Sequence, residues 1–491
     1  MKTILSVILF FISLLTAAQN KIPFNLYFLD QTLRIDYFHT GNAKSEEITT
    51  DKLYAEGSWA GNPENCIQPF ELGIYKVSVE DLEYKRLIYS KGYTTLFAEY
   101  QTTEAALSGI KRTFHESVLI PYPKRPFRLI IEKRDRYNKL SPLFIKVIDP
   151  SDYSIIKQKA GFSNDVVVPM VRNGDPHNKV DIVILAEGYQ AEEIHKFKID
   201  LENYSRIFYS VEPYKSRASQ FNIQGIFAPS EESGTDEPRQ HIFKSTRFGS
   251  TFNYFDLDRY CLADDNKNIR DAAAKVPYDI IVVMVNRERY GGGGIYNWQT
   301  VFTARSEKSD YVFLHEFGHA FAGLADEYFS SPVTYVDFYT EGVEPLEANI
   351  TSLPDKNNVK WKTYLSPGIS VPTDWGKATY DSLVNLRTQS YIEGEKKISE
   401  LRKSGASEQS LEIAREDIRK KINFISQRID DFYENHPLKD KVGVFEGANY
   451  MSEGMYRPTL MSLMHGFEKT LSYDVVNEQE IIKMIKYYTG E

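Results

Sequence analysis

Residues 315–328, HEFGHAFAGLADEY, hold two histidines four residues apart and a glutamate directly after the first. On an α-helix, residues four apart lie on nearly the same face, so the imidazoles of His315 and His319 would point at one spot. Apolar residues follow Asp310 at helical spacing, and Gly323 is a typical helix terminator. The pattern predicts a helix that is capped by Asp310, ends at Gly323 and presents two imidazoles. A charged helix end without a ligand is the alternative.

The chemistry of this pair favours zinc. Two neutral imidazoles suit zinc, and Glu316, rotated by about 100° around the helix, would lie beside the open position of the metal. Zinc lowers the pKa of a bound water to about 7, and a neighbouring carboxylate can take the proton from that water. We therefore expect His315 and His319 to be metal ligands, Glu316 to be the catalytic base, and one Zn²⁺ to be the cofactor.

A catalytic zinc also needs a third protein ligand and keeps its fourth position for water. Gly323 would let the chain leave the helix in a left-handed conformation, and Asp326 could then reach the metal. Glu327 and Asp310 compete for this role, as does a distant residue such as His465. We predict Asp326 as the third ligand and keep the alternatives open.

Other metal sites receive less support from the sequence. Cys66 and Cys261 are the only cysteines, so a disulfide framework and a four-thiolate zinc site are excluded. The acidic loop at residues 231–237 could bind Ca²⁺, but it lacks the alternating oxygen donors of a calcium loop. We interpret this loop as solvated and leave calcium unsupported.

The rest of the chain predicts an α+β multidomain protein. Residues 19–160 contain short stretches rich in β-branched and aromatic residues, which predict an antiparallel β-sandwich accessory domain. Its isolated histidines, His39 and His115, are interpreted as surface or packed side chains. In residues 161–491, apolar strands alternate with helical stretches, which is typical of an α/β domain with a mixed sheet.

A helical insertion is predicted within this second domain, at about residues 379–436. Apolar residues recur there at steps of three and four, and Gly405 interrupts the pattern. The stripe resembles a heptad repeat but is short for a free coiled coil. A helical hairpin is therefore favoured over a coil that binds a partner.

The first eighteen residues indicate export. They contain one early Lys, an apolar run at residues 4–15, and the small residues Ala17 and Ala18. This pattern is typical of a secretory signal peptide, and the run is shorter than the roughly 20 residues that span a bilayer. We expect a periplasmic, cell-surface or extracellular protein with no transmembrane segment; an uncleaved anchor is the alternative.

The charge of the chain bears on its partners. The net charge of −9 is mild for 491 residues, and the basic residues are scattered rather than gathered in a stripe. Nucleic acid is therefore not an expected partner. A protein or peptide substrate is expected, and glycan binding by the N-terminal domain remains open.

The zinc segment resembles that of the metzincin metalloproteases, HExxHxxGxxH or HExxHxxGxxD, but Gly323 stands one position later than in that pattern. Together with ESGTDEPR, ERYGGGGIYN and GANYMSEGMYRPTLMSLM, the segment is more closely similar to the bacterial IgA-peptidase family of secreted zinc metalloendopeptidases. The likeness extends over about residues 25–485. It implies a metzincin-like α/β zinc-protease domain after a β-rich N-terminal domain.

The resemblance also implies roles for single residues. His315, His319 and Asp326 correspond to the metal ligands and Glu316 to the catalytic base. Met464 is the candidate for the methionine turn below the metal, with Met461 second. Family members often have Cys-x-Met where this chain has Ser-Leu-Met.

Three further features are candidates for the substrate cleft. The stretch RYGGGGIYNW, residues 289–298, could form a cleft edge at which glycines let a substrate backbone approach and pair, or it could be a mobile loop. Tyr450 and Tyr456 could donate to the oxyanion of a tetrahedral intermediate. Packing is the favoured role of both tyrosines.

These observations predict a secreted, zinc-dependent endopeptidase that hydrolyses peptide bonds with Glu316 as general base. Two alternatives remain. One is a non-catalytic surface or glycan-binding protein with a structural zinc site. The other is a zinc amidase that acts on a non-protein substrate.

Overall fold

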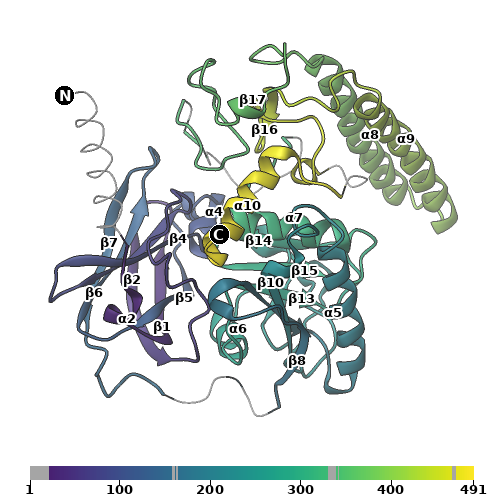
Figure 1. The fold of residues 1–491 in the computed structure, drawn as a ribbon. Coiled ribbons are helices and arrows are strands. Elements are labelled where there is room, and N and C mark those ends of the chain that lie inside the picture. The colour runs from purple at the N-terminus through teal and green to yellow at the C-terminus, as the bar shows by residue number, and fades with distance from the viewer. Residues whose placement is uncertain (1–20, 158–160, 162–163, 330–338, 341, 467–470) are drawn as a thin grey trace, which may run out of the picture. The chain divides into compact units, whose positions relative to one another are not determined.

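The structure is a computed structural model that describes residues 21–157, 161, 164–329, 339, 340, 342–466 and 471–491. The predicted signal peptide, residues 1–18, lies outside the described residues. The chain forms two compact units. The first comprises the chain up to Leu324 with Val333–Glu347 and Asn477–Glu491, and the second comprises Ala325–Pro332 and Ala348–Val476. The prediction of a mixed α and β chain with several sheets is confirmed (Figure 1).

Two antiparallel sheets form the N-terminal part of the first unit. One has the strand order β2-β1-β5 and the other β4-β3-β6-β7. Buried side chains of both sheets, such as Leu33 and Ile35 from one and Val77 and Val79 from the other, enclose a shared apolar core. The elements are α2 (Phe24–Tyr27), β1 (Phe28–Gly41), β2 (Glu46–Ala55), β3 (Tyr75–Asp81), β4 (Arg86–Tyr93), α3 (Leu96–Tyr100), α4 (Glu104–Leu107), β5 (Arg112–Pro123), β6 (Phe127–Arg134) and β7 (Leu140–Ile148).

A six-stranded sheet forms the centre of the remaining first unit, in the order β14-β15-β13-β9-β10-β8. The four inner strands are parallel, and the edge strands β8 and β14 are antiparallel to their neighbours. Every residue of β9 and β13 is buried, as expected for parallel strands covered on both faces. The strands are β8 (Val166–Val171), β9 (Val180–Glu187), β10 (Phe221–Phe227), β13 (Ile280–Val285), β14 (Gly292–Ile295) and β15 (Gln299–Thr303).

Helices cover this sheet and fix the position of the predicted metal-binding segment. Helix α7 packs on β14 and β15 (Figure 1). Its Phe313 ring lies 4.9 Å from the Phe302 ring of β15, and Tyr204 of α5 contacts both rings. The remaining elements of this region are β11 (Ser250–Thr251) and β12 (Leu262–Ala263), and the helices are α5 (Ile194–Phe208), α6 (Asn266–Ala273), α7 (Ser309–Ala322) and α10 (Val475–Thr489), the last of which belongs to the first unit from Asn477 on.

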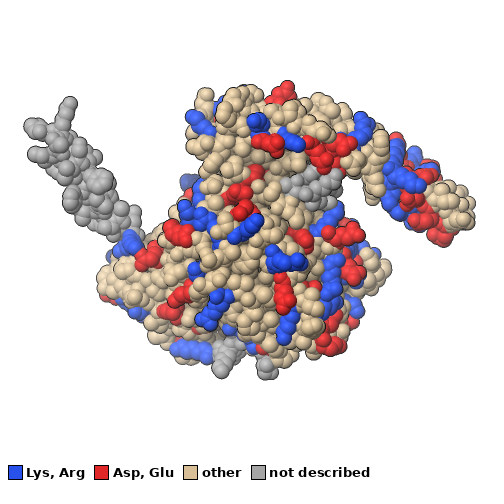
Figure 2. All heavy atoms as spheres, turned by 45° about the vertical axis from the view of Figure 1, so that its right-hand side comes forward, with Lys and Arg blue, Asp and Glu red and all other residues tan. Residues whose placement is uncertain are grey.

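The second unit contains a helical hairpin and a β-hairpin. Helices α8 (Lys377–Lys403) and α9 (Glu408–Glu434) are joined by a turn with Gly405 in a left-handed conformation. They approach closely at Gly394, where an added Cβ would lie 2.6 Å from Ile418. Acidic and basic side chains are interspersed along both helices (Figure 2). The β-hairpin consists of β16 (Phe445–Ala448) and β17 (Met451–Arg457).

Hydropathy gives no membrane-spanning element in the part of the chain that the structure describes. None of the helices found there is long and apolar enough to cross a bilayer.

Candidate metal centre

Helix α7 brings His315 and His319 together as predicted for residues four apart. Their Nε2 atoms lie 3.0 Å from each other. The helix begins at Ser309, so Asp310 lies in its first turn and is not the cap that was predicted. The helix ends at Ala322, and Gly323 follows in the left-handed conformation, with a φ of 61°. The prediction that Gly323 terminates the helix is confirmed.

Contacts at the other ring nitrogens orient both imidazoles. The Nδ1 of His319 lies 2.6 Å from the carbonyl oxygen of Leu324, which can only accept a hydrogen bond. The proton of a neutral His319 therefore sits on Nδ1, and its Nε2 presents a lone pair towards His315. The Nδ1 of His315 lies 3.0 Å from the hydroxyl of Tyr311. Such contacts to the second nitrogen are typical of histidines that bind a metal.

The spacing of the two nitrogens fits one divalent cation. Two ligands of a tetrahedral zinc, each about 2.05 Å from the metal, lie about 3.3 Å apart. The observed separation of 3.0 Å is close to this value. Glu316 completes a group of three side chains whose ligand atoms all lie within 4.8 Å of one another. The residues present thus fit a zinc ion.

Strand β14 forms one wall beside this group, and its glycines are required by packing. A Cβ on Gly294 would lie 2.1 Å from the backbone oxygen of Glu316, and one on Gly292 would lie 2.6 Å from Val312. On the opposite face, a Cβ on Gly293 would lie 2.4 Å from the ring of Tyr260. The missing side chains therefore make room for α7 on one face of β14 and for Tyr260 on the other. Residues 292–295 form an edge strand of the sheet, so the alternative of a loop does not hold for these residues, and pairing with a substrate stays a prediction.

Glu327, one competitor for the third ligand, is held by neighbours in the second unit. It is fully buried, its Oε1 accepts a hydrogen bond of 2.9 Å from the Asn349 amide, and its Oε2 accepts one of 2.5 Å from the Ser462 hydroxyl. Its backbone N–H donates to the carbonyl of Met464 at 2.8 Å. Oε2 and the backbone N–H of Glu327 thus anchor the segment that contains Met464, and Oε1 is held by Asn349.

Asp326 lies next to Glu327 but has different contacts. Its Oδ2 accepts a hydrogen bond from the hydroxyl of Tyr450, and its side chain is 7% exposed. Asp326 belongs to the second unit, whereas His315 and His319 belong to the first. Its role as third ligand stays a prediction.

The predicted methionine turn is a single 3₁₀ turn, Leu463–His465. Met464 is fully buried, and its N–H donates to the Ser462 hydroxyl at 3.1 Å. Burial and the nearby charge of Arg457 lower the pKa of His465 well below its ordinary value. Its Nε2 lies 3.4 Å from the Tyr433 hydroxyl. Met461, the second candidate, packs half-buried against an apolar cluster of the second unit.

The acidic loop 231–237 differs from its interpretation as a solvated loop. Glu237 is fully buried and forms ion pairs with Arg287 and with Arg289, the latter at 2.8 Å. The Asp236 carboxylate accepts the backbone N–H of Lys244 at 2.5 Å. These partners hold Glu237 and Asp236, while Glu231 is exposed, and they give no support to a calcium site.

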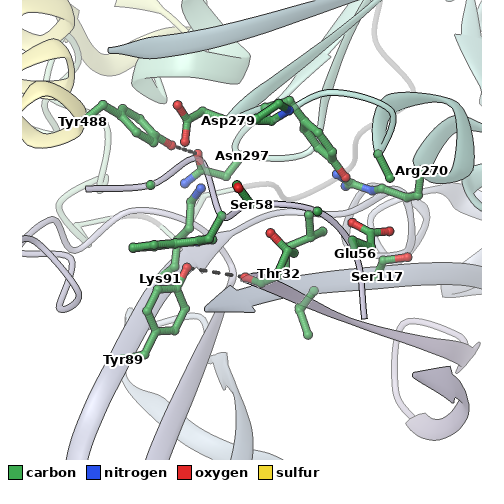
Figure 3. A pocket seen from close by; sticks show the side chains of 18 of the residues that line it. Thr32, Glu56, Ser58, Tyr89, Lys91, Ser117, Arg270, Asp279, Asn297 and Tyr488 are labelled. Carbon is green, nitrogen blue, oxygen red and sulfur yellow. Dashed lines mark hydrogen bonds between the residues drawn. The ribbon is translucent and has the colours of Figure 1, made fainter. Parts of the chain in front are cut away.

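A separate polar cavity of about 80 Å³ lies in the first unit, between the N-terminal sheets and the six-stranded sheet (Figure 3). Burial lowers the pKa of Lys91 in its wall to about 8 and raises the pKa of Asp279 to about 7. The hydroxyl of Tyr488 donates to Asn297 at 3.3 Å. None of the residues predicted for the metal centre lines this cavity.

Sequence reasoning missed a second group of histidine and carboxylates in the N-terminal sheets. Strand pairing places His115 of β5 beside Asp36 of β1 and Asp51 of β2, with their ligand atoms within 4.8 Å of one another. No local motif signals this group, because its members are 15 to 79 residues apart in the sequence.

Comparison with known families covers nearly the whole chain. The family model described as Peptidase M64 N-terminus matches residues 23–145, and the model described as IgA Peptidase M64 matches residues 168–485. No curated protein matches the chain. The second match alone spans more than half of the 491 residues and includes α7 with its pair of histidines. The chain therefore belongs to the IgA peptidase M64 family and is a peptidase by that membership.

Proposed function

We propose that this protein is a zinc-dependent endopeptidase with a metzincin-like catalytic domain, in which His315, His319 and Asp326 bind the metal and Glu316 is the general base. The observation that carries the proposal is the pair of Nε2 atoms 3.0 Å apart, with the Nδ1 of His319 fixed by a carbonyl. Bound zinc would supply a Lewis acid that polarises the scissile carbonyl and makes water acidic enough to lose a proton near pH 7.

Glu316 is suited to move that proton. It follows His315 directly, so its carboxylate leaves the helix about 100° away from the imidazole and lies near the pair without replacing either ring. An ionised carboxylate accepts the proton of the attacking water and can then donate it to the leaving amine. The glycines of β14 allow the helix to lie against the sheet edge, which fixes the origin of this side chain.

Two contacts support Asp326 over its competitors as third ligand. Both carboxylate oxygens of Glu327 accept hydrogen bonds, from Asn349 and from Ser462, so this carboxylate already has a structural role. His465 is buried, and its Nε2 lies 3.4 Å from the Tyr433 hydroxyl, in the turn that Glu327 anchors. We assign the structural role of the methionine turn to Met464, which is joined to Glu327 by a backbone hydrogen bond.

The decisive experiment compares wild type with Glu316→Gln, using elemental analysis for zinc and a mixed peptide library for cleavage. We expect one zinc per chain in both proteins, and a loss of about 10²–10⁴-fold in kcat in the variant, the range given by removal of a general base. Glu307→Gln, an exposed position just before α7, is the matched control and should retain full activity.

Other outcomes have distinct meanings. Full peptidase activity of Glu316→Gln at unchanged zinc content would refute the mechanism. Zinc in both proteins with no cleavage by wild type would favour a structural zinc site in a surface or glycan-binding protein, or an amidase for a non-protein substrate. Saturable glycan binding would then separate these two alternatives.

Export is part of the proposal. Cleavage after residue 18 would release a mature chain beginning at Gln19 into the periplasm, onto the cell surface or into the medium. The measurement is the intact mass of the protein recovered outside the cytoplasm. A mass that includes residues 1–18 would contradict cleavage.

A further inference from the structure

The β-hairpin of the second unit turns through two residues in an uncommon conformation. Ala448 pairs with Met451, so Asn449 and Tyr450 are the two turn residues. Both have a positive φ, 44° for Asn449 and 64° for Tyr450. Turns of this type favour Asn followed by Gly, because a side chain at positive φ is sterically disfavoured. A tyrosine at the glycine position indicates that its side chain has a function to which the turn is adapted.

Polar contacts join this turn to the segment that contains the predicted third ligand. The Asn449 N–H donates to the carbonyl of Asp326 at 3.0 Å, and the Tyr450 N–H donates to the carbonyl of Tyr328 at 3.1 Å. The Tyr450 hydroxyl donates to the Oδ2 of Asp326. The turn therefore holds both the backbone and the carboxylate at this position.

Tyr328 supports the phenol from the side. Its ring lies edge-on to the Tyr450 ring at 5.4 Å, and the two hydroxyls are 3.3 Å apart. Edge-to-face packing restricts the Tyr450 ring to one orientation, so that its hydroxyl stays directed at Asp326. On the next residue, Glu327 is fixed by Asn349 and Ser462 instead. The carboxylates of Asp326 and Glu327 are thus held by different partners. Of the two, Asp326 is the one that is held by a phenol.

We propose that Tyr450 is a positioning residue for the metal centre, because its hydroxyl fixes the carboxylate of Asp326 in the orientation needed to bind zinc. This inference rests on the proposed function, since it requires that Asp326 be a ligand. A donor to one oxygen of a ligating carboxylate fixes its plane, and losing such a contact typically weakens metal binding about 10–100-fold. Tyr450 does not act on the substrate and takes no part in proton transfer.

The test measures zinc affinity of the full mature chain by competition with a chelator, and the visible absorption spectrum of the cobalt-substituted protein. Tyr450→Phe removes one oxygen and keeps the ring, so a packing role would be unaffected. We expect zinc affinity to fall about 10–100-fold, and the cobalt bands to change in position or intensity. Tyr364→Phe, an exposed tyrosine of the same unit, is the control and should change neither.

Two further variants keep the result interpretable. Tyr450→Gly suits the positive φ and so preserves the turn while removing the phenol; it should lose zinc affinity at least as much as Tyr450→Phe. Asp326→Asn should lose more than either. Unchanged zinc affinity and cobalt spectrum in Tyr450→Phe would overturn the positioning role while leaving the proposed function intact. Full zinc affinity in Asp326→Asn would also overturn the positioning role of Tyr450. Absence of zinc from the wild type would overturn both this role and the proposed function.

Discussion

Two groups of histidine and carboxylate side chains in the first unit look alike by distance and differ in chemistry. His315, Glu316 and His319 on α7 form one group, and Asp36, Asp51 and His115 in the N-terminal sheets form the other. In each, the ligand atoms lie within 4.8 Å of one another. Proximity alone would therefore assign a metal to both.

The hydrogen bond at the second ring nitrogen separates the two groups. The Nδ1 of His319 faces a carbonyl, which leaves Nε2 with a lone pair for a metal. In the sheet group, the Ser117 hydroxyl donates to Asp36, so it must accept from the amide NH₂ of Asn266, at 2.7 Å. The same NH₂ lies 3.1 Å from the Nδ1 of His115.

His115 therefore carries its proton on Nε2. That nitrogen lies 3.5 Å from the Oδ2 of Asp51 and 3.8 Å from the Oδ2 of Asp36. Asp36 is also paired with Arg34 at 3.0 Å, which supplies positive charge from the protein itself. The sheet group is a histidine held between carboxylates, and no lone pair remains on it for a metal. The donor and acceptor pattern around a cluster, and not its number of possible ligands, therefore distinguishes the two groups as metal sites.

The largest expected effect is on zinc binding, when one histidine of each group is replaced in separate variants. His319→Asn should weaken zinc binding by more than about 100-fold, since loss of a direct ligand exceeds the cost of losing a supporting contact, and it should abolish peptidase activity. His115→Asn should keep one zinc per chain and full activity. Elemental analysis and peptide cleavage measure both. Loss of the bound zinc in His115→Asn would contradict the claim that the α7 group, and not the sheet group, binds zinc.

The second prediction concerns the strand against which α7 lies. Gly294→Ala would place a methyl group 2.1 Å from the backbone oxygen of Glu316, so the helix must shift away from β14. Overpacking of this kind costs about 1–3 kcal/mol of the free energy of unfolding. We expect lower stability in chemical denaturation together with weaker zinc binding. Gly57→Ala, where an added Cβ meets no atom within 4 Å, is the control. Equal stability of the two variants would contradict the packing role of the β14 glycines.

Local features of the α7 group could be predicted from the sequence, because they depend on neighbours a few residues away. The spacing of His315 and His319 sets their shared face, and Gly323 ends the helix as expected. The start was placed wrongly, since Asp310 lies inside the first turn where a negative charge also stabilises a helix. An aspartate is favoured both at the N-cap and in the first turn of a helix. The sequence pattern alone therefore does not show which of these two positions Asp310 occupies.

Contacts made by tertiary folding could not be predicted. Ser462 binds Glu327 across 135 residues, and Tyr450 binds Asp326 across 124. The packing of the β14 glycines against α7 and Tyr260 could not be predicted either, whereas substrate pairing at this strand stays a prediction. In each case the residue type can make several kinds of contact. The contact that forms depends on an element that is distant in the chain.

The third prediction concerns a substitution that gives the sheet group the hydrogen-bond pattern of the α7 group. Asn266→Asp replaces the donor at the Nδ1 of His115 by an acceptor, which would move the proton to Nδ1 and free Nε2. We expect a second, weaker zinc to bind at micromolar concentrations, detected by titration of metal content. Asn268→Asp, on the same helix but hydrogen-bonded to Asp265, is the control and should not add a zinc. A folded Asn266→Asp protein without a second zinc would contradict the tautomer argument.

The smallest effect is expected at His39, a histidine of the same sheets with carboxylates at both nitrogens. Its Nδ1 lies 3.0 Å from Glu116 and its Nε2 3.1 Å from Glu46, and carboxylates only accept, so the ring holds both protons. Burial lowers the pKa of His39, but attraction to Glu116 and Glu46 outweighs burial and raises it above its ordinary value. The raised pKa stabilises the fold fully below the unfolded value of about 6.5, and this stabilisation is lost as pH rises through the folded-state pKa.

His39→Gln should therefore lower the melting temperature more at about pH 6 than at about pH 9, since only the wild type loses a proton between them. Each kcal/mol of this difference corresponds to about 2–4 °C in a domain of about 150–250 residues, and to less in a longer chain. His195→Gln, exposed on α5, is the control and should show no such dependence. A melting-temperature difference that stays constant with pH would mean that His39 does not titrate in this range. Glu116 and Glu46 would then hold His39 by hydrogen-bond geometry rather than by charge. His39 would no longer be a charged histidine that contrasts with His319, whose Nε2 carries a lone pair.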